Sequence, residues 1–135
     1  MRLARAATSG TRVCYKDLLK IRVRNLSRDA VLATEAEVAD TSKKRRIGLR
    51  KHQSLAPGEG MWISPCEAIH TIGMKFAIDV LFLSRTREVV KLKEAVPPGR
   101  IAVCLRAHSV LELPAGTIAS TGTQVGDRLQ FERVP

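Results

Sequence analysis

The chain has 135 residues, of which 44% are hydrophobic and 27% are charged, close to the average of globular proteins. A chain of this length is the size of one domain and buries roughly two thirds of the surface that its unfolded form exposes. No apolar run approaches the roughly 18 residues that cross a bilayer, so we expect no membrane partner. The N-terminus lacks the apolar segment of a secretory signal, and three cysteines are too few for a disulfide framework. These features predict a cytoplasmic protein.

The net charge of +10 is concentrated in the N-terminal half, because nine of the ten excess positive charges precede Gln53. Residues 1–18 are predicted to be a basic N-terminal extension, and residues 19–135 a single β-rich domain. Basic residues before Gln53, including the segment KKRRIGLRKH, are able to neutralise phosphates, which makes nucleic acid one alternative partner. Aromatic residues do not interleave with these basic clusters, so stacking platforms for bases are missing and we do not favour this partner.

The first part of the domain reads as a hairpin followed by a helix. Residues 18–40 alternate apolar and polar side chains on both sides of a turn-forming stretch, NLSRDA. Next, Thr41 or Ser42 is suited to be the N-cap of a short basic helix of about ten residues. Gly48 lies inside this segment and is a poor helix former, so either the backbone packs closely there or the helix ends early.

The remainder of the chain is predicted to be β-structure. MWISP is a short strand, and residues 80–96 form a second hairpin that Pro97, Pro98 and Gly99 close. Residues 108–116 and 128–134 are further strands, with turns between them. Short strands without βαβ alternation predict a mainly β, single-domain sandwich or small barrel with one short helix.

Cysteine and histidine residues occur in two pairs, Cys66 with His70 and Cys104 with His108. On an extended strand, residues four apart are about 13 Å from each other, too far to share one zinc ion. We therefore predict no metal site and no cofactor. A cysteine and a histidine on different strands are still able to meet, so a small hydrolase-like enzyme acting through Cys66 or Asp79 stays an alternative.

Several motifs resemble those of a known family. In order, RRIGL, LAPGEGMWISP, IHTIGMKFAIDVLFL, SVLELPAGT and GTQVGDRL resemble the motif series of the uncharacterised conserved family catalogued as domain of unknown function 192, over about residues 20–134. The resemblance implies a compact, mostly β domain with a short helix and brings no established activity. The matching residues are Arg45, Gly48, Leu49, Gly60, Met61, Met74, Lys75, Ile78, Asp79, Glu112, Leu113, Gly116, Gly126 and Asp127. Ala77 departs from the family's usual proline, and Ile72 with Gly73 replaces the aromatic residue that many members carry.

The segment from Ile72 to Phe82 suggests a site. If it is one unbroken strand, every second residue from Ile72 lies on an apolar face, and Lys75 and Asp79 share the other face with two small residues. Small residues beside a cation and an anion are typical of a place where a ligand or another backbone approaches closely. The alternative is structural: Met74 fills the core, Lys75 is solvated and Asp79 caps a turn or forms an ion pair.

We predict a non-enzymatic module that binds a small molecule or a protein. The candidate ligand-binding residues are Arg45, His70, Met74, Lys75, Asp79 and Glu112.

Overall fold

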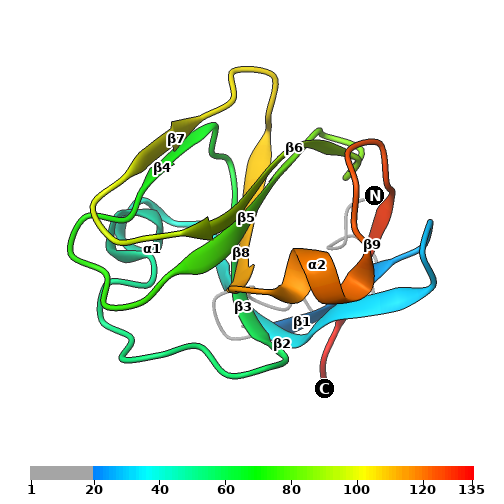
Figure 1. Ribbon diagram of the computed structural model, residues 1–135, viewed down its shortest axis with the longest axis horizontal. Helices are drawn as coiled ribbons and strands as arrows, with labels where there is room; N and C mark the ends of the chain where they lie inside the picture. Colours follow the sequence, from blue (N-terminus) through cyan, green and yellow to red (C-terminus); the bar gives the residue numbers. More distant parts are fainter. Residues whose placement is uncertain (1–19) are drawn as a thin grey trace, which may run out of the picture.

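The computed structural model describes residues 20–135, so the predicted extension of residues 1–18 lies outside the described residues. The described chain contains strands and two short helices, shown in Figure 1. Their bounds are β1 Lys20–Asn25, β2 Ala30–Ala39, α1 Ser42–Ile47, β3 Glu59–Ile63, β4 Ala68–His70, β5 Ile78–Leu83, β6 Val89–Val96, β7 Ile101–Val103, β8 Ser109–Pro114, α2 Thr117–Thr121 and β9 Leu129–Arg133. Neither described helix is long and apolar enough to span a bilayer.

Seven of the strands form one curled sheet in the order β6-β5-β8-β3-β2-β1-β9, and β4 pairs with β7 in a separate two-stranded sheet. Neighbours in the large sheet are antiparallel except β2 and β3, which run parallel. The sheet curls far enough for its two edges to touch, because Glu88 pairs with Arg128 and the Val89 amide donates to the Asp127 carbonyl over 2.9 Å. This half-barrel confirms the predicted mainly β fold class.

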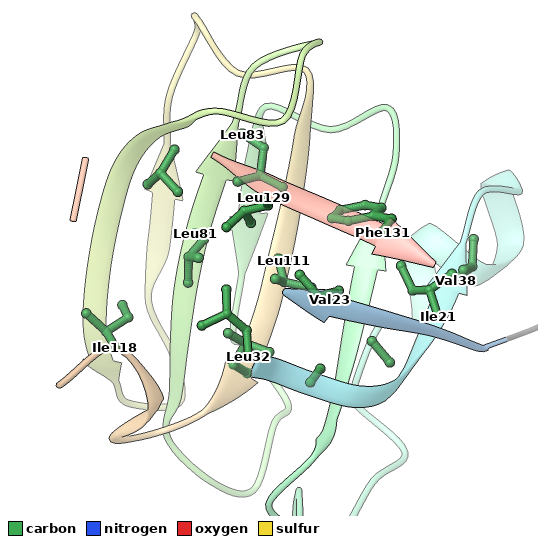
Figure 2. Packing of buried hydrophobic residues seen from close by; sticks show 14 residues of the cluster. Ile21, Val23, Leu32, Val38, Leu81, Leu83, Leu111, Ile118, Leu129 and Phe131 are labelled. Atoms are coloured by element: carbon green, nitrogen blue, oxygen red, sulfur yellow. The ribbon is translucent and has the colours of Figure 1, made fainter. Parts of the chain in front are cut away.

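The curled sheet has a hydrophobic cluster on each face. Inside the curl, Leu81 of β5, Leu111 of β8 and Val23 of β1 belong to one cluster, whose packing Figure 2 shows. On the outer face, Val80 and Phe82 of β5 pack with Val110 of β8 in a second cluster. Central strands β5 and β8 therefore have apolar neighbours on both faces, unlike a strand with one solvated face.

The outer cluster is covered by the β4–β7 pair and by the turn after α1. Ile69 of β4, Ala102 of β7 and Leu49 after α1 all contribute buried side chains to it. In Figure 1 these elements lie on the left of strands β5 and β8, whereas α2, β9 and β1 lie on the right of them. Together with the outer face of the large sheet, this covering layer encloses the candidate site.

The structure confirms both predicted hairpins, β1–β2 and β5–β6. It shortens the predicted helix from about ten residues to the six of α1. The Thr41 hydroxyl accepts a hydrogen bond from the Lys44 amide at the N-cap, as expected, and Gly48 ends the helix at a φ of 51°. This φ is costly for other residues, so the glycine explains the early end. Residues 117–121, expected as turns, form α2.

The condition of one unbroken strand from Ile72 to Phe82 is not met, because β5 begins only at Ile78. The preceding residues form turns, and the Met74 amide donates to the Thr71 carbonyl over 3.1 Å. As a result Ile72 is 54% exposed, although the alternating pattern placed it in the core. Met74 remains buried, so the turn preserves the burial expected at Met74 and loses the burial expected at Ile72.

Asp79 is fully buried and holds the junction of β6, β8 and α2 together. Its Oδ1 accepts a hydrogen bond from the Ala95 amide at 2.8 Å, and its Oδ2 accepts from Gly116 at 3.1 Å and Ile118 at 2.8 Å. The N-cap residue of α2 is Gly116, which has no side chain to offer. Asp79 therefore supplies from a distant strand the acceptor that an N-cap side chain normally provides.

The carboxylate of Asp127 is a second buried polar group with several hydrogen-bond partners. Asn25 donates to Asp127 at 2.9 Å, and Arg28 contacts both oxygens of the same carboxylate, at 3.0 and 3.1 Å. Burial acts to raise the pKa of Asp127, but the bonds from Arg28 and Asn25 hold this pKa below its usual value. The charged carboxylate thus ties the β1–β2 turn to the segment before β9.

We predict that Asp79→Asn destabilises the domain by about 2 kcal/mol or more, because hydrogen bonds to a charged acceptor contribute roughly 1.5 to 3 kcal/mol each and the amide leaves some donors unpaired. Urea unfolding measures the change. Asp29→Asn is the matched control: Asp29 is exposed at a φ of 52°, which asparagine tolerates, so its variant should stay within about 0.5 kcal/mol of wild type. Equal stabilities of the two variants would contradict the role given to Asp79.

Candidate functional site

A cleft of about 1130 Å³ lies between α1 with its following turn, the β4–β7 pair and the outer face of the large sheet. Ligand sites in proteins have volumes of roughly 300 to 1,000 Å³, so this one has room for a drug-sized molecule. Its lining comes from segments far apart in the sequence. The lining residues used below are Arg45, Arg46, Ile47, Arg50, Ile63, Cys66, Glu67, His70, Met74, Arg85, Leu105, Arg106, His108 and Glu112.

Among the acidic and basic residues that line this cleft, Glu112 is the most buried, with only 3% of its surface exposed. It lies on β8 opposite Met61 of β3 and Val80 of β5, and directly paired residues share a face of the sheet. Both partners belong to the outer cluster, so the Glu112 side chain is on the cleft side. Within residues 20–135 its carboxyl group has no hydrogen-bond or ion-pair partner.

Burial without a partner determines the protonation of Glu112. Loss of solvation raises its pKa from 4.5 to about 8, so the group is mostly neutral at pH 7. A neutral carboxylic acid is a hydrogen-bond donor through its O–H as well as an acceptor. The cleft therefore has an unused donor at its floor.

Gly60 on β3 allows the neighbouring strand to lie close at this point. A Cβ atom added to Gly60 would be 2.8 Å from the carbonyl oxygen of Glu112 and 3.0 Å from the Leu113 side chain. Real Cβ atoms do not approach a backbone oxygen so closely, hence any other residue would push β8 away. Gly60 therefore allows β8 to lie close to β3 at Glu112.

The rim of the cleft is strongly basic. Arg45 is held in place by its own bonds, since Nη1 donates to the carbonyl oxygens of Asp40 at 3.0 Å and Ser64 at 3.5 Å. Arg46 and Arg85 line the cleft without a hydrogen bond or ion pair to any described residue. Arg50 and Arg106 complete the set. Against these five guanidinium groups the described lining contains the carboxylate of Glu67 and the largely neutral Glu112.

Cys66 lies in the cleft but is not activated as a nucleophile. Its thiol donates to the Ala68 carbonyl over 3.1 Å, and burial raises its pKa above the ordinary 9.0. A nucleophilic cysteine needs a lowered pKa or an adjacent base. His108 contributes its backbone carbonyl to the Cys66 amide, at 2.8 Å, and no described imidazole bonds to the thiol. The environment of Cys66 does not favour the hydrolase alternative.

No group of three or more histidine, cysteine, aspartate or glutamate side chains in residues 20–135 is arranged to hold a metal ion. Cys104 and Cys66 are both free thiols, and Cys104 packs in the outer hydrophobic cluster. Cys104 therefore behaves as a small apolar residue.

Four of the six predicted site residues line the cleft: Arg45, His70, Met74 and Glu112. Lys75 and Asp79 do not. Lys75 is exposed and its Nζ lies 3.4 Å from the Arg50 carbonyl oxygen, whereas the Asp79 carboxyl is fully buried and bonded to three amides. The turn before Ile78 separates them, and they form no ion pair.

The arginines beyond Arg45 were missed by the sequence reasoning. Arg46 and Arg50 lie on the same short segment as Arg45, so the basic run RRIGLR was a usable signal. Arg85 and Arg106 come from the loops after β5 and β7, and nothing in their local sequence sets them apart from ordinary solvated arginines. Only the three-dimensional fold brings them to one rim.

The sequence profile of the DUF192 family, described as "Uncharacterized ACR", matches residues 23–131. The chain belongs to this family. Two relatives are UPF0127 proteins, each 33% identical to this chain. PF1050 of Pyrococcus furiosus aligns over 118 residues, 82% of this chain and 97% of its own, and the Thermococcus sibiricus protein over 116 residues, 80% of this chain and 73% of its own.

Two solved structures share the fold of this DUF192 domain. A protein of Sinorhizobium meliloti 1021 superimposes with a TM-score of 0.73 at 25% identity, covering 84% of this chain and 92% of its own. A protein of unknown function from Novosphingobium aromaticivorans does so with a TM-score of 0.69 at 23% identity, covering 82% of this chain and 83% of its own. The half-barrel with its covering strand pair is therefore seen outside this chain.

For this DUF192 domain we predict a pH-dependent stability that originates from Glu112. Between pH 4.5 and about 8 the folded state keeps the Glu112 proton while the unfolded state releases it, so raising the pH favours unfolding. The free energy of unfolding of wild type, minus that of Glu112→Gln, should fall across this window by up to about 1.4 kcal/mol per pH unit. Above the window it should level off.

Urea unfolding of both proteins from pH 5 to pH 9 measures this difference, in which groups common to both cancel. Glu35→Gln is the control, because Glu35 lies on the exposed side of β2 with 51% of its side chain accessible. The difference in free energy of unfolding between wild type and Glu35→Gln should not change with pH. An equally flat difference for Glu112→Gln would show that the carboxyl is ionised in the folded state.

Proposed function

We propose that this domain binds a small molecule, without catalysing a reaction on it, in the cleft that Arg45, His70, Met74 and Glu112 help to line. One observation carries the proposal: Glu112 is 97% buried at the cleft, yet has no partner among the described residues. The Glu112 oxygens are not among the fully buried atoms of residues 20–135 that lack a partner, so they open into the space of the cleft. Holding this carboxyl out of bulk water without a bond to the protein is unfavourable for folding, and a group of this kind is typical of a site that serves binding.

The geometry around the cleft supports binding over catalysis. Catalysis of acyl transfer at Cys66 would need a thiolate or a base beside the sulfur. The raised pKa of this thiol works against the thiolate, and the sulfur bonds to the Ala68 carbonyl and to no basic side chain of residues 20–135. Lys75 and Asp79 are left out of the proposed site, because neither lines the cleft.

The proposal predicts that small probe molecules gather in the cleft. We would titrate the ¹⁵N-labelled chain separately with benzoate, benzylamine and benzyl alcohol and follow the amide signals. At least one probe should give saturable shifts concentrated in residues 45–50, 66–70 and 105–108. Glu112→Leu should remove most of the shift, whereas Glu35→Leu, the exposed control on β2, should leave it.

Because Glu112→Leu also removes an unpaired buried polar group, it should unfold no more easily than wild type. A folded variant therefore makes the titration interpretable. Shifts that are scattered over the surface, that do not saturate for any probe, or that persist in Glu112→Leu would overturn the proposed function.

A second candidate, nucleic-acid binding, has one specific observation in its favour. Basic residues of the segment 43–51 stand beside Arg85 and Arg106 from distant loops, which gives a positive surface rather than isolated charges. The Sinorhizobium neighbour is described provisionally as a transcription regulator. We rank this candidate second, since phosphate contacts leave the buried Glu112 unexplained.

Fluorescence anisotropy with a labelled 20-base-pair DNA tests this second candidate. It predicts binding at low salt that weakens steeply as salt rises, and a further loss in a Lys43→Gln/Lys44→Gln variant compared with Lys93→Gln on β6. No change of anisotropy at 20 mM salt would dismiss it.

A further inference from the structure

The cleft combines three chemically different surfaces. Its floor carries the Glu112 carboxyl group, its rim carries arginines from three separate segments, and apolar side chains stand between them. The apolar lining includes Ile47, Ile63, Met74 and Leu105. A ligand that fills this cleft therefore has to match a charge pattern as well as a volume.

We propose that the ligand is an amphipathic anion: an anionic group bound by the rim arginines and by the Glu112 carboxyl as hydrogen-bond donor, attached to an apolar body that contacts the cleft walls. The inference rests on the proposed function and names the ligand class for that same site.

The charge of the rim selects an anion. Arg46 and Arg85 have no described partner, so their guanidinium groups are available to a ligand without breaking a contact within residues 20–135. Arg45 keeps its orientation through the Asp40 and Ser64 carbonyls and the Ser42 hydroxyl, and its Nε–H donor has no partner among residues 20–135. Guanidinium groups bind carboxylates and phosphates through charge-assisted, often bidentate, hydrogen bonds. A cationic ligand would be repelled by the same rim.

Glu112 is able to bind an anionic group only in its neutral form. The O–H of a carboxylic acid donates to an anionic oxygen, whereas an ionised Glu112 would repel it. Burial raises the pKa of Glu112 to about 8, so the donor is present at pH 7. Arg45, Cys66 and Glu112 all line this one cleft, so the rim and the floor face the same space.

Other titratable or charged groups also line the cleft around Glu112. They are Arg45, Arg46 and Arg50 of the α1 segment, Cys66 and Glu67 before β4, His70 of β4, Arg85 after β5, and Arg106 with His108 after β7. Burial and Arg85 lower the pKa of His108, and burial raises the pKa of Cys66 above 9.0. Of these shifted groups, Glu112 is the one that titrates between pH 7 and 9.

The apolar side chains in the walls of the cleft indicate that the ligand carries an apolar body. Met74 and Ile63 are buried, Ile47 is half-buried, and Leu105 is 77% exposed at the mouth of the cleft. Ile47 and Leu105 therefore offer most of the apolar surface that a ligand is able to cover. Covering such surface gains roughly 25 cal/mol for each Å² removed from water, a gain that an inorganic anion cannot obtain. The ligand class is therefore a carboxylate or phosphate that carries an apolar group.

Isothermal titration with a charge series tests the inference. The probes are 3-phenylpropionate, 3-phenylpropylamine and 3-phenylpropan-1-ol, which share one apolar body, together with inorganic phosphate, which has none. At pH 7 the propionate should bind at least about tenfold more tightly than the alcohol or phosphate, a difference of about 1.4 kcal/mol. The amine should not bind.

Variants of the rim separate the cleft from general surface charge. Arg46→Gln/Arg85→Gln should weaken 3-phenylpropionate binding by at least about fivefold, since each lost guanidinium removes a charge-assisted contact. Arg22→Gln/Arg133→Gln, which removes the same charge from β1 and β9 outside the cleft, is the matched control and should change the affinity less than about twofold.

The pH dependence reports on Glu112 itself. Above pH 8 the free protein has to take up a proton to restore the donor, so the affinity for 3-phenylpropionate should fall by up to about tenfold per pH unit between pH 8 and 9.5. Titrations in two buffers of different ionisation enthalpy measure the proton uptake. Glu112→Gln retains an N–H donor without a titrating group, so its affinity should vary little over the same range.

The outcomes distinguish the inference from the proposed function. Binding of the alcohol or the amine in the cleft as tightly as the propionate would overturn the anion inference while the small-molecule function stands. An affinity that is equal in the rim variant and its control, or independent of pH in wild type, would overturn it too. Failure of every probe to bind in the cleft would overturn both.

Discussion

Strands β5 and β8 are covered on both faces, and the rest of this half-barrel depends on that double burial. Their sequences, IDVLFL and SVLELP, are nearly continuous apolar runs, as strands without a solvated face require. One face looks into the curl of the sheet, and the other is closed by the β4–β7 pair and the turn after α1. Each strand nevertheless contains one acidic residue, Asp79 or Glu112, in a place where an ionised carboxylate is costly.

The two carboxyl groups meet this cost in opposite ways. Asp79 accepts three backbone hydrogen bonds and thereby joins β5 to the ends of β6, β8 and α2. Glu112 has no such partner and stays largely protonated in the wall of a cleft. One acidic residue therefore belongs to the architecture and the other is free for a ligand. At similar burial, Asp79 has a structural role because amides converge on it, whereas Glu112 faces open space in the cleft and is the residue to which we assign a ligand.

The sequence predicted the fold class well because its main signals are local. Alternation and turn residues located both hairpins, and Thr41 with Gly48 marked the ends of α1. Periodicity failed between Ile72 and Ala77, where alternating apolar residues are distributed along turns instead of a strand. Alternation alone does not distinguish an extended strand from a compact turn that buries every second side chain, and Met74 is buried in either case.

The candidate site was only partly predictable, for a physical reason. Arg45 and Glu112 carried motif resemblance, but the cleft is made where four separate segments meet, and sequence separation hides such meetings. Of the other motif residues, Gly60 and Asp127 have roles in the architecture, in the approach of β3 to β8 and in closing the curl. The motif series therefore describes mostly how the half-barrel is assembled. Arg85 and Arg106, which lie outside it, contribute to what the cleft is able to bind.

The depth of Glu112 and the charge of the rim are connected. On a strand with one solvated face, this carboxyl would be ionised at neutral pH and would neutralise a neighbouring guanidinium group. Covering β8 on both faces keeps the carboxyl neutral, so the positive charge of the rim is not cancelled from below. Gly60 keeps β8 close to β3 at this point, because a Cβ atom there would lie 2.8 Å from the Glu112 carbonyl oxygen. The double-covered sheet thus does more than stabilise the fold: it maintains an acidic side chain in its neutral form beside the arginines, and the anion site that we propose depends on this arrangement.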